Sequence, residues 1–477
     1  MSELRCDLLI VGAGPAGMAA AIAARRHGLS VIVADEGLSA GGQIYRQAAA
    51  SPLADAGALG AEYAAGRSLI ERFKACGAQY FPRTLVWQIE PRPSPVAMLT
   101  RGGVDSGTLL VQAEAVLLAT GAQERPWAVR GWILPGVMGV GAAQTALKSA
   151  GLVPGADTVL VGSGPLLWLF ASQLQKAGRT IRAVVDTTPR GAWQRALRHV
   201  PRALLAADYL LKGVRMMRAV RRAGVDIHRA AQDVEVLGET HAQGVRFRTG
   251  SNQHELAAGL VLLHQGVVPG TNAARSIGCA HRWDAAQACW HPQVDAWGRS
   301  SVPRVWIAGD GAGIGGAKVA QCAGELAALD IALDLQRIDA STRDRESRAP
   351  RATSKRHGAV RPLLDALYTP EPALRRPADD VIVCRCEEVS AGEIRRIATL
   401  GCTGPNQMKA FSRCGMGPCQ GRWCGTTVAE LLLEVQDRQP DEVGYCRIRA
   451  PVKPVTIKEI ANAMPAGSEL VRGEFPG

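Results

Sequence analysis

The sequence predicts an α/β fold in which two dinucleotide-type βαβ units precede a small cysteine-rich domain. In the first unit, a buried strand from Cys6 to Val11 leads into the glycine turn Gly12–Gly17, and an alanine-rich helix and a further strand follow. A second strand, glycine turn and helix begin near Thr158, which indicates a distant internal duplication. Seven of the 12 cysteines lie between Cys384 and Cys446, and this grouping favours a separate metal-binding domain.

Length and composition are typical of a soluble globular protein with more than one domain. The chain has 477 residues, of which 47% are hydrophobic and 21% are charged. Its net charge of +12 comes from scattered Lys and Arg without interleaved stacking aromatics, which argues against nucleic-acid binding. No stretch is long and apolar enough to span a bilayer. We expect a cytoplasmic protein whose cysteines bind a metal rather than form disulfides.

The first glycine turn has the residues that a dinucleotide requires. Gly12 permits the tight turn, Gly14 lets a pyrophosphate approach the backbone, and Gly17 lets helix and strand pack closely. Asp35 stands 23 residues after Gly12, at the end of the second strand, where a carboxylate accepts hydrogen bonds from a ribose. Glu36 is the neighbouring candidate for the same role. Together these residues predict a dinucleotide site.

The second glycine turn departs from this pattern. It begins with Gly162 and Gly164, but Leu167 replaces the third glycine and would crowd a pyrophosphate. No basic pair follows the next strand to bind a 2′-phosphate, although Asp186 could bind a ribose. We interpret this unit as a retained scaffold. Binding of ATP or another nucleotide, or weak binding of NAD(H), stays open.

Four cysteines form two short pairs in the C-terminal part of the chain. Cys384 and Cys386 are followed, after 32 residues, by Cys419 and Cys424. Two such pairs can supply four thiolates to one iron–sulfur cluster. Cys414 is a rival ligand because it is also close to Cys419. Zinc is the competing metal, although four-cysteine zinc sites usually have C-x-x-C pairs.

Three further segments resemble the flavoproteins with two dinucleotide folds, of the thioredoxin reductase and ferredoxin reductase type. These are the A-T-G segment that ends at Gly121, the I-A-G-D-G segment of residues 307–311, and the G-G-Q segment of residues 41–43. The resemblance implies that the first unit binds FAD. It implies flavin contacts from Gly42, Gln43, Thr120, Gly121, Asp310 and Gly311, with Arg46 and Val86 as additional candidates.

The cysteine region is similar to the [2Fe–2S] domain of the bacterioferritin-associated ferredoxin type. That domain has a C-x-C pair followed, at this distance, by a second close pair. The run from Cys386 to Cys419 matches the length in the family, whereas a run to Cys414 is five residues shorter. The resemblance therefore implies Cys384, Cys386, Cys419 and Cys424 as the ligands of a [2Fe–2S] cluster.

Nearly the whole chain resembles the A subunits of opine oxidases, the B subunits of hydrogen cyanide synthases and the alpha subunits of hydroxyproline and proline dehydrogenases. The motifs that carry this resemblance are G-G-Q-I-Y-R, G-A-Q-E-R-P, L-P-G-V-M and G-M-G-P-C-Q-G-R-x-C. The resemblance implies a partner beta subunit, a flavoprotein similar to D-amino acid oxidases, that oxidises an amine or imino acid. It also implies, in some relatives, an FMN at a subunit interface and a small ferredoxin-like gamma subunit.

On this interpretation the chain relays electrons from the partner's flavin, through FAD and the cluster, to an external acceptor. Membrane association would then arise through that acceptor. An NAD(P)H-dependent flavoprotein reductase with an iron–sulfur relay is the alternative, and Leu167 argues against it. A non-catalytic electron-transfer or assembly subunit, inactive without its partners, is a second alternative. No residue is assigned as catalytic, since no His/Asp or His/Glu pair has a distinctive spacing.

The expected domain organisation follows the order of these motifs. The expected parts are a discontinuous FAD-binding domain (residues 1–125 and 265–336), a degenerate second nucleotide domain (126–264), a linker (337–380), the [2Fe–2S] domain (381–435) and a docking tail (436–477). The linker is expected because residues 337–380 are rich in Arg and Pro.

Overall fold

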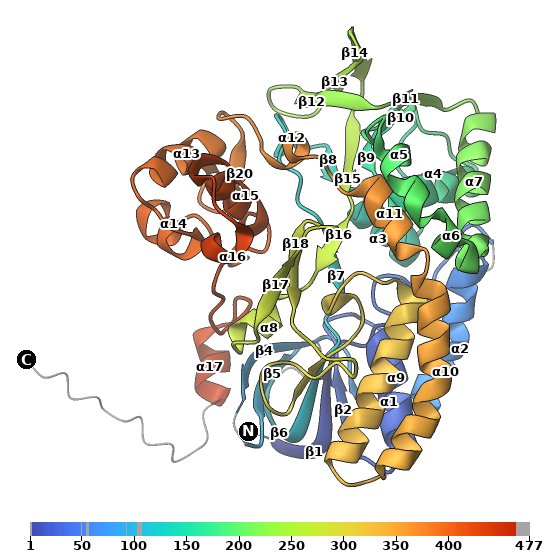
Figure 1. The fold of residues 1–477 in the computed structure, drawn as a ribbon, viewed down its shortest axis with the longest axis vertical. Coiled ribbons are helices and arrows are strands. Elements are labelled where there is room, and N and C mark those ends of the chain that lie inside the picture. Colours follow the sequence, from blue (N-terminus) through green and yellow to red (C-terminus); the bar gives the residue numbers. More distant parts are fainter. Residues whose placement is uncertain (1, 49, 54–56, 92, 103–106, 464–477) are drawn as a thin grey trace, which may run out of the picture.

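The computed structural model describes residues 2–48, 50–53, 57–91, 93–102 and 107–463 (Figure 1). The strand that leads into the first glycine turn lies in the middle of a seven-stranded sheet. The strands of this sheet are β3 (Gln79–Phe81), β2 (Val31–Ala34), β1 (Ser2–Val11), β6 (Gly107–Leu118), β5 (Val96–Arg101) and β4 (Thr84–Glu90), in spatial order, with β19 (Val305–Ile307) beside β6. β1 pairs in parallel with both β2 and β6. Where β1 runs beside β2 and β6 runs beside β19, at residues 8–11 and 116–118, the parallel strands are wholly apolar, as in a sheet that is covered on both faces.

Two helices cover one face of this sheet and pack closely together. They are α1 (Pro15–Arg26), which follows the glycine turn, and α9 (Ala317–Asp334). The contact depends on small residues, because a Cβ placed on Gly324 would lie 2.0 Å from the carbonyl oxygen of Ala16. The remaining elements of this region are α2 (Ala61–Ala75), α8 (Asn272–Ser276), β17 (His281–Asp284), β18 (Cys289–Pro292) and the 3-10 helix η3 (Gly309–Gly311).

A second sheet contains the second glycine turn. Its strands are β11 (Asp226–Arg229), β10 (Ala183–Asp186), β9 (Thr158–Ser163), β15 (Leu260–Gln265) and β8 (Val137–Gly139) in spatial order. A three-stranded sheet of β12 (Ala231–Leu237), β13 (Gly244–Thr249) and β14 (Asn252–Ala257) lies beside it. The helices are α3 (Val140–Ala150), α4 (Pro165–Lys176), α5 (Ala192–Ala196), η1 (Leu197–His199), α6 (Val200–Ala203), η2 (Leu204–Ala206) and α7 (Ala207–Arg222). The antiparallel strands β7 (Ala122–Glu124) and β16 (Val267–Pro269) connect this region to the first sheet.

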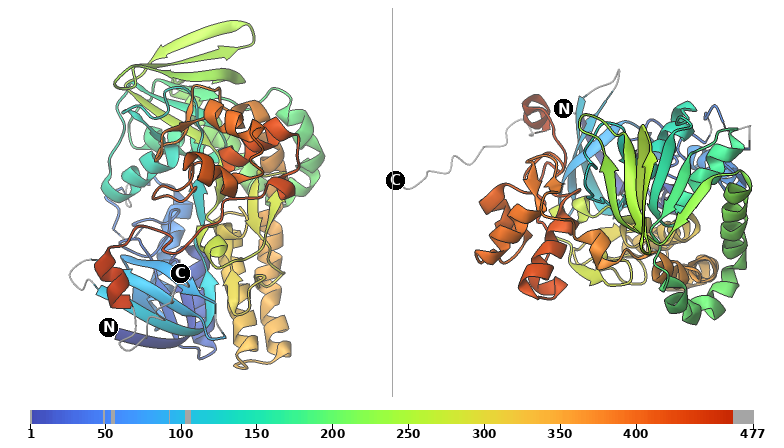
Figure 2. Two further views of the ribbon diagram at one scale, coloured as in Figure 1. Left: turned by 90° about the vertical axis from the view of Figure 1, so that its left-hand side faces the viewer. Right: turned by 90° about the horizontal axis from the view of Figure 1, so that it is seen from above.

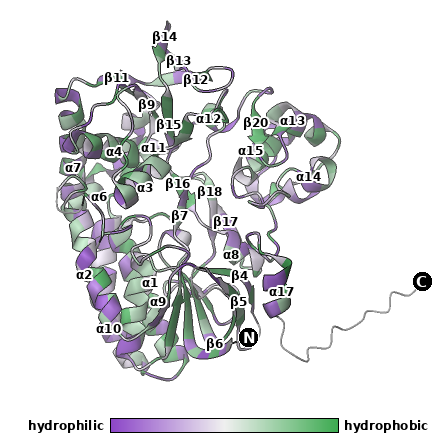
Figure 3. Cartoon of the chain, turned by 180° about the vertical axis from the view of Figure 1, so that it is seen from behind, coloured by the Kyte–Doolittle hydropathy of each residue, from purple (hydrophilic) through white to green (hydrophobic). Residues whose placement is uncertain are grey.

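The segment 337–380 differs from the linker that its composition suggests, because most of it is helical. It contains α10 (Ala340–Gly358), α11 (Arg361–Tyr368) and α12 (Pro372–Arg375). α10 begins where the side chain of Asp339 accepts a hydrogen bond from the N–H of Thr342, and it packs along α9. Helix α10 is largely hydrophilic, whereas the strands of the first sheet are hydrophobic (Figure 3). A sequence with so few apolar residues carries no clear helical pattern.

The cysteine domain is a separate helical unit beside β7 and β16, which we call the crossing strands because they connect the two sheets (Figures 1 and 2). It consists of β20 (Ile382–Cys384), β21 (Val389–Ser390), α13 (Ala391–Thr399), α14 (Pro405–Ser412) and α15 (Gly425–Gln436). Its apolar core is its own and contains Cys384, Cys414 and Cys424.

The tail after α15 returns to the first sheet. It includes α16 (Pro440–Val443) and α17 (Ile457–Ala463), and α17 contacts β5 and β6. The N–H of Val452 donates to the carbonyl oxygen of Trp87 at 2.9 Å. The last part of the expected docking tail, 464–477, lies outside the described residues. Within the described part of the chain, no helix combines the length and apolar character that crossing a bilayer requires.

Candidate functional site

The first glycine turn is closed so tightly that two of its glycines have no room for a side chain. Gly12 has a φ of +108°, and a Cβ on it would lie 2.4 Å from the carbonyl oxygen of Ala119. A Cβ on Gly17 would lie 1.9 Å from the carbonyl oxygen of Gly12. These contacts hold β1, the start of α1 and the end of β6 together.

Gly14 differs because the space above it is open. A Cβ on Gly14 would have only one neighbour within 4 Å, the Cα of Gly42 at 3.8 Å. The N–H of Gly41 donates to the carbonyl oxygen of Ala13 at 2.8 Å and holds the G-G-Q segment over the turn. Because no side chain caps the N-terminus of α1, its N–H groups are available to a phosphate. The turn therefore forms a cradle that fits a pyrophosphate.

The two acidic candidates at the end of β2 point to different partners. The carboxylate of Asp35 accepts the N–H groups of Ala13 and Gly37, both at 2.6 Å, and so lies against the glycine turn. Glu36 instead forms an ion pair with Lys453 of the tail. Of the two, only Asp35 contacts the cradle, as a ribose-binding carboxylate would.

The A-T-G and G-D segments meet beside the cradle. The hydroxyl of Thr120 donates to the carbonyl oxygen of Gly270 at 2.8 Å, and the N–H of Gly270 donates to the carbonyl oxygen of Gly121 at 2.8 Å. A Cβ on Gly311 would lie 3.1 Å from the Thr120 hydroxyl. Asp310 accepts two backbone N–H groups of the loop before α9, both at 2.9 Å. Segments separated by almost 200 residues thus form one wall.

A buried lysine that the sequence analysis did not select lies under the G-G-Q segment. The ammonium group of Lys148, on α3, donates to the carbonyl oxygens of Gln43 and Ile44 at 3.0 and 3.2 Å and to the side chain of Gln144 at 3.0 Å. Burial, and secondarily the charge of Arg46, lowers the pKa of Lys148 to about 8. The buried Nε of Arg46 has no hydrogen-bond partner among the described residues. An anionic or hydrogen-bonding group would satisfy it.

Val86, the last flavin candidate, lies in the ladder between β4 and β5, opposite Leu99. It is buried, and the carbonyl group of the next residue, Trp87, is taken by the tail. Val86 lies in the same apolar cluster as Ala34, which precedes Asp35, and its contact with the cofactor stays a prediction.

The second glycine turn is occupied by the protein's own side chains. A Cβ on Gly164 would lie 3.4 Å from Nε2 of His264, so the imidazole fills the space above that glycine. Leu167 is fully buried at the start of α4. The hydroxyl of Ser163 donates to Gln265, and Gln265 donates to Thr187, at 3.1 and 2.8 Å. These contacts use polar groups that a bound dinucleotide would need.

Two acidic residues near this second turn are also engaged. Glu124 lies 2.6 Å from Nδ1 of His264 and accepts the N–H of Gly141. Asp186 accepts the N–H and the hydroxyl of Thr188 at 2.9 and 2.6 Å, and its burial raises its pKa. The carboxylate that the sequence offered for a ribose is therefore bonded within its own loop.

Five cysteines gather at one end of the cysteine domain. The sulfur atoms of Cys384, Cys414 and Cys424 lie within 4.8 Å of one another, and all three residues are buried. The sulfur atoms of Cys386 and Cys419 are 4.0 Å apart, and Cys386 is exposed. We call Cys384, Cys414 and Cys424 the inner set and Cys386 and Cys419 the outer pair; all four predicted ligands are among these five residues. Because Cys414 lies in the inner set, it remains an alternative ligand.

The donor set suits an iron–sulfur cluster. A [2Fe–2S] cluster takes four cysteine thiolates, two on each iron. The outer pair would supply one iron, and two of the three inner cysteines would supply the other. Of the two remaining cysteines of this region, the buried Cys446 lies beside Gly421 and Gly425, and the thiol of Cys402 donates to the carbonyl oxygen of Gly404.

The cysteine group lies directly against the crossing strand β7. The side chain of Gln123 donates to the carbonyl oxygen of Arg422 at 2.9 Å, between two of the predicted ligands. Asn272 approaches the carbonyl oxygen of Cys419 at 3.5 Å. Since Gln123 stands only two residues after Gly121, the same short segment borders the cradle and the cysteines. No sequence pattern singled out Gln123 or Asn272.

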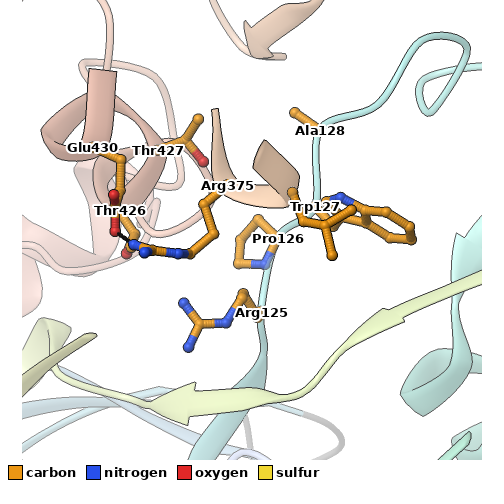
Figure 4. Close-up of a pocket in the computed structure, with 9 residues that line it drawn as sticks. Arg125, Pro126, Trp127, Ala128, Arg375, Thr426, Thr427 and Glu430 are labelled. Atoms are coloured by element: carbon orange, nitrogen blue, oxygen red, sulfur yellow. Dashed lines mark ion pairs between the residues drawn. The ribbon is translucent and has the colours of Figure 1, made fainter. Parts of the chain in front are cut away.

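A small hollow of about 20 Å³ lies where the cysteine domain meets the crossing segment (Figure 4). Its lining residues are Arg125, Pro126, Trp127, Ala128, Leu374, Arg375, Thr426, Thr427 and Glu430. It has room for a water molecule but not for a cofactor. Glu430 of α15 is 3% exposed and forms an ion pair there with Arg375 of α12, as Figure 4 shows. This buried pair fastens the cysteine domain to the segment before it.

Replacing Glu430 with alanine is expected to loosen the cysteine domain. The change leaves the charge of Arg375 buried without a partner, which costs about 3 kcal/mol of stability. Thermal unfolding and limited proteolysis between α12 and β20 measure the effect. The matched control is Asp380→Ala, which removes the exposed pair with Arg130 and should cost less than about 1 kcal/mol. Equal losses in the two variants would contradict the role of the buried pair.

Comparisons with known proteins agree with this arrangement. Residues 6–327 match the family described as Pyridine nucleotide-disulphide oxidoreductase, and residues 382–434 match the BFD-like [2Fe-2S] binding domain. The chain is 43% identical to the opine oxidase A subunit of Rhizobium meliloti (strain 1021) over 96% of this chain and 98% of that protein. It is 31% identical to the hydrogen cyanide synthase subunit HcnB of Pseudomonas aeruginosa over 95% and 98% of the two chains.

Among solved structures, L-proline dehydrogenase from P. horikoshii has a similar fold. The TM-score is 0.69 at 19% sequence identity, and the match covers 96% of this chain and 80% of that one. The predicted fold class and the predicted resemblance are therefore confirmed. The two family matches imply a flavin for residues 6–327 and a [2Fe–2S] cluster for residues 382–434.

Proposed function

Because this chain belongs to the pyridine nucleotide-disulphide oxidoreductases, and within them to the group that contains the opine oxidase A subunits, we propose that it is the electron-transferring subunit of an amine or imino-acid dehydrogenase. In this proposal the flavin is FAD, held by the cradle of Gly12, Gly14, Gly17 and Asp35. The cluster is held by Cys384, Cys386, Cys419 and Cys424. The relatives that support it are oxidoreductase subunits of multi-subunit enzymes.

The position of β7 between the cradle and the cysteines supports the proposal most strongly. Thr120 and Gly121 border the cradle, and Gln123 donates to the carbonyl oxygen of Arg422 beside the cysteines. In this proposal, backbone only a few residues long joins the flavin site to the cluster site. Such a connection serves a subunit whose task is to pass electrons between them.

A flavin accepts two electrons and releases them singly, and a [2Fe–2S] cluster carries one at a time. The chain's own groups prepare the sites for this chemistry. The N-terminus of α1 offers its N–H groups to the pyrophosphate, and Asp35 is placed for the ribose. Lys148 puts a buried ammonium group under the G-G-Q segment. The burial of Cys384 and Cys424 shields the inner side of the cluster from water.

We place the oxidation of the substrate on a partner subunit. The partner proposed is a flavoprotein similar to D-amino acid oxidases that takes a hydride from the carbon next to the substrate nitrogen. Opines, hydroxyproline and proline are the proposed substrate class, following the resemblance and the names of the relatives. An FMN at the subunit interface and a small ferredoxin-like subunit belong to the same proposal. ATP or another nucleotide in the second domain has less support, because Leu167 replaces the third glycine and the imidazole of His264 lies above Gly164.

Reduction by NADH separates this proposal from a nicotinamide-dependent reductase. Because Leu167 replaces the third glycine and the imidazole of His264 lies above Gly164, stoichiometric NADH or NADPH should leave the flavin of the purified chain oxidised over minutes. An opine or imino acid should bleach the flavin only when the partner subunit is present. Absorbance near the flavin maximum reports both experiments.

Two results would reject the proposal. Rapid bleaching by NADH would make the chain a reductase. Turnover of the amine by the isolated chain would move the substrate site onto this subunit.

A further inference from the structure

A basic and apolar surface covers one side of the second nucleotide domain. It is formed by the consecutive helices α5, η1, α6, η2 and α7, and we call residues 190–222 the helical flank. In Figure 1 these helices lie along the right-hand edge, and the view from above in Figure 2 also places α7 on the side opposite the cysteine domain. The flank therefore lies away from the cysteine domain, and a role for it goes beyond the proposed function.

The flank carries most of the net charge of the protein. It contains nine basic residues and one acidic residue, a net charge of +8 out of +12 for the whole chain. The basic residues are Arg190, Arg195, Arg198, Arg202, Lys212, Arg215, Arg218, Arg221 and Arg222, and the acidic residue is Asp208. All eight arginines are exposed, and none forms an ion pair with another described residue. Lys212 alone is paired, with Glu62.

Large apolar side chains are exposed among these arginines. Trp193, Leu197, Leu204 and Leu205 are 56%, 62%, 60% and 60% exposed, and Leu211 and Val214 of α7 follow at 48% and 37%. Between α5 and η2 the inner face is made of alanines, which pack with residues of α11 in one small apolar cluster, whereas α7 turns Val220 inward. In residues 192–206 the small side chains thus face the protein and the largest apolar ones face outward, which is the reverse of an ordinary surface helix.

We propose that the helical flank binds an anionic lipid surface. Leucine and tryptophan side chains can enter the boundary between headgroups and acyl chains, while arginines with long apolar stems bind lipid phosphates. Helices that lie on a membrane have this composition, with a strongly basic polar component. A second copy of the chain is a poor occupant, because two surfaces of charge +8 repel each other. An acidic protein partner is the other occupant that the test distinguishes.

Sedimentation with lipid vesicles tests the proposal on the full chain. We expect binding to phosphatidylcholine vesicles that contain about a quarter phosphatidylglycerol, and little binding to phosphatidylcholine alone. The triple variant R195Q/R198Q/R202Q should bind the anionic vesicles about 100-fold more weakly, since each basic residue near such a surface contributes about fivefold. The variant L204S/L205S should also bind more weakly, and its remaining binding should disappear at high salt.

The control removes three positive charges from another exposed helix. The variant R348Q/K355Q/R356Q changes α10 and should keep its vesicle affinity within about twofold. Unchanged flavin content and circular dichroism establish that the variants are folded. Absence of binding to anionic vesicles, or equal losses in the two triple variants, would overturn the proposal. The proposal would also be overturned if the chain did not bind lipid and instead bound a purified partner subunit tightly, and if the R195Q/R198Q/R202Q variant lost that binding.

Discussion

Replacing Gly14 with alanine is expected to weaken flavin binding and leave the fold intact. The added Cβ meets only the Cα of Gly42, at 3.8 Å, and the φ of Gly14 is −77°, so the apoprotein accepts the methyl group without strain. The methyl group would stand where a pyrophosphate approaches the N-terminus of α1. Loss of hydrogen bonds to a charged phosphate should weaken flavin affinity roughly 10- to 100-fold. Fluorescence titration of the apoprotein with FAD measures it.

Replacing Gly17 with alanine is expected to do something different, namely to destabilise the protein itself. The new Cβ would lie 1.9 Å from the carbonyl oxygen of Gly12, so β1 and α1 must move apart at a cost of about 3 kcal/mol. Thermal unfolding without flavin should separate the two variants, with G14A within about 1 kcal/mol of the parent protein. Gly107→Ala, which has open space around it, is the neutral control. Equal stability of the two apoproteins would contradict this account of the turn.

The second large effect is expected at the cysteines. Serine in place of Cys384, Cys386, Cys419 or Cys424 should each remove most of the bound iron and acid-labile sulfide, because a [2Fe–2S] cluster needs four thiolates. Alanine in place of Cys414 should leave the cluster in place. Absorbance, iron content and electron paramagnetic resonance after reduction measure the outcome. Flavin content should not change in any of the five variants.

The inner set of sulfur atoms makes Cys414 the informative position. It lies within 4.8 Å of Cys384 and Cys424, as a ligand would. If the Cys414 variant loses the cluster while the variant of Cys419 or Cys424 keeps it, the assignment must be exchanged. If the parent protein and every variant lack the absorbance of an iron–sulfur cluster, and the parent protein holds one zinc ion, the cluster assignment fails as a whole.

Some features of the site could be predicted because each depends on a short stretch of chain. Gly12 and Gly17 are required by a turn that is closed within a few residues, and a positive φ or a close backbone contact leaves a clear mark in the sequence. The departure of the second turn from the dinucleotide motif is evident from Leu167 alone. The cysteine spacing identified a cluster domain because thiolate ligands have few other uses in such numbers.

Other features escaped prediction because they depend on packing between segments far apart. Lys148 lies on an alanine-rich helix, and its position beside the G-G-Q segment is evident only from the packing of α3 against the carbonyl groups of Gln43 and Ile44. The bond from Gln123 to Arg422 joins residues 299 positions apart. Residues 340–358 have the composition of a linker, because a helix with so few apolar residues is recognised only from the α9 surface that it covers.

Short motifs were enough to predict the class of fold, the family and the two kinds of cofactor, since these follow from local backbone geometry and ligand chemistry. Three features became evident only from the folded chain: the imidazole of His264 lies above Gly164, Cys414 joins Cys384 and Cys424, and β7 borders both the cradle and the cysteines. Each of these depends on which distant side chains share one small volume. That is set by how whole helices and strands pack, and no short pattern encodes it.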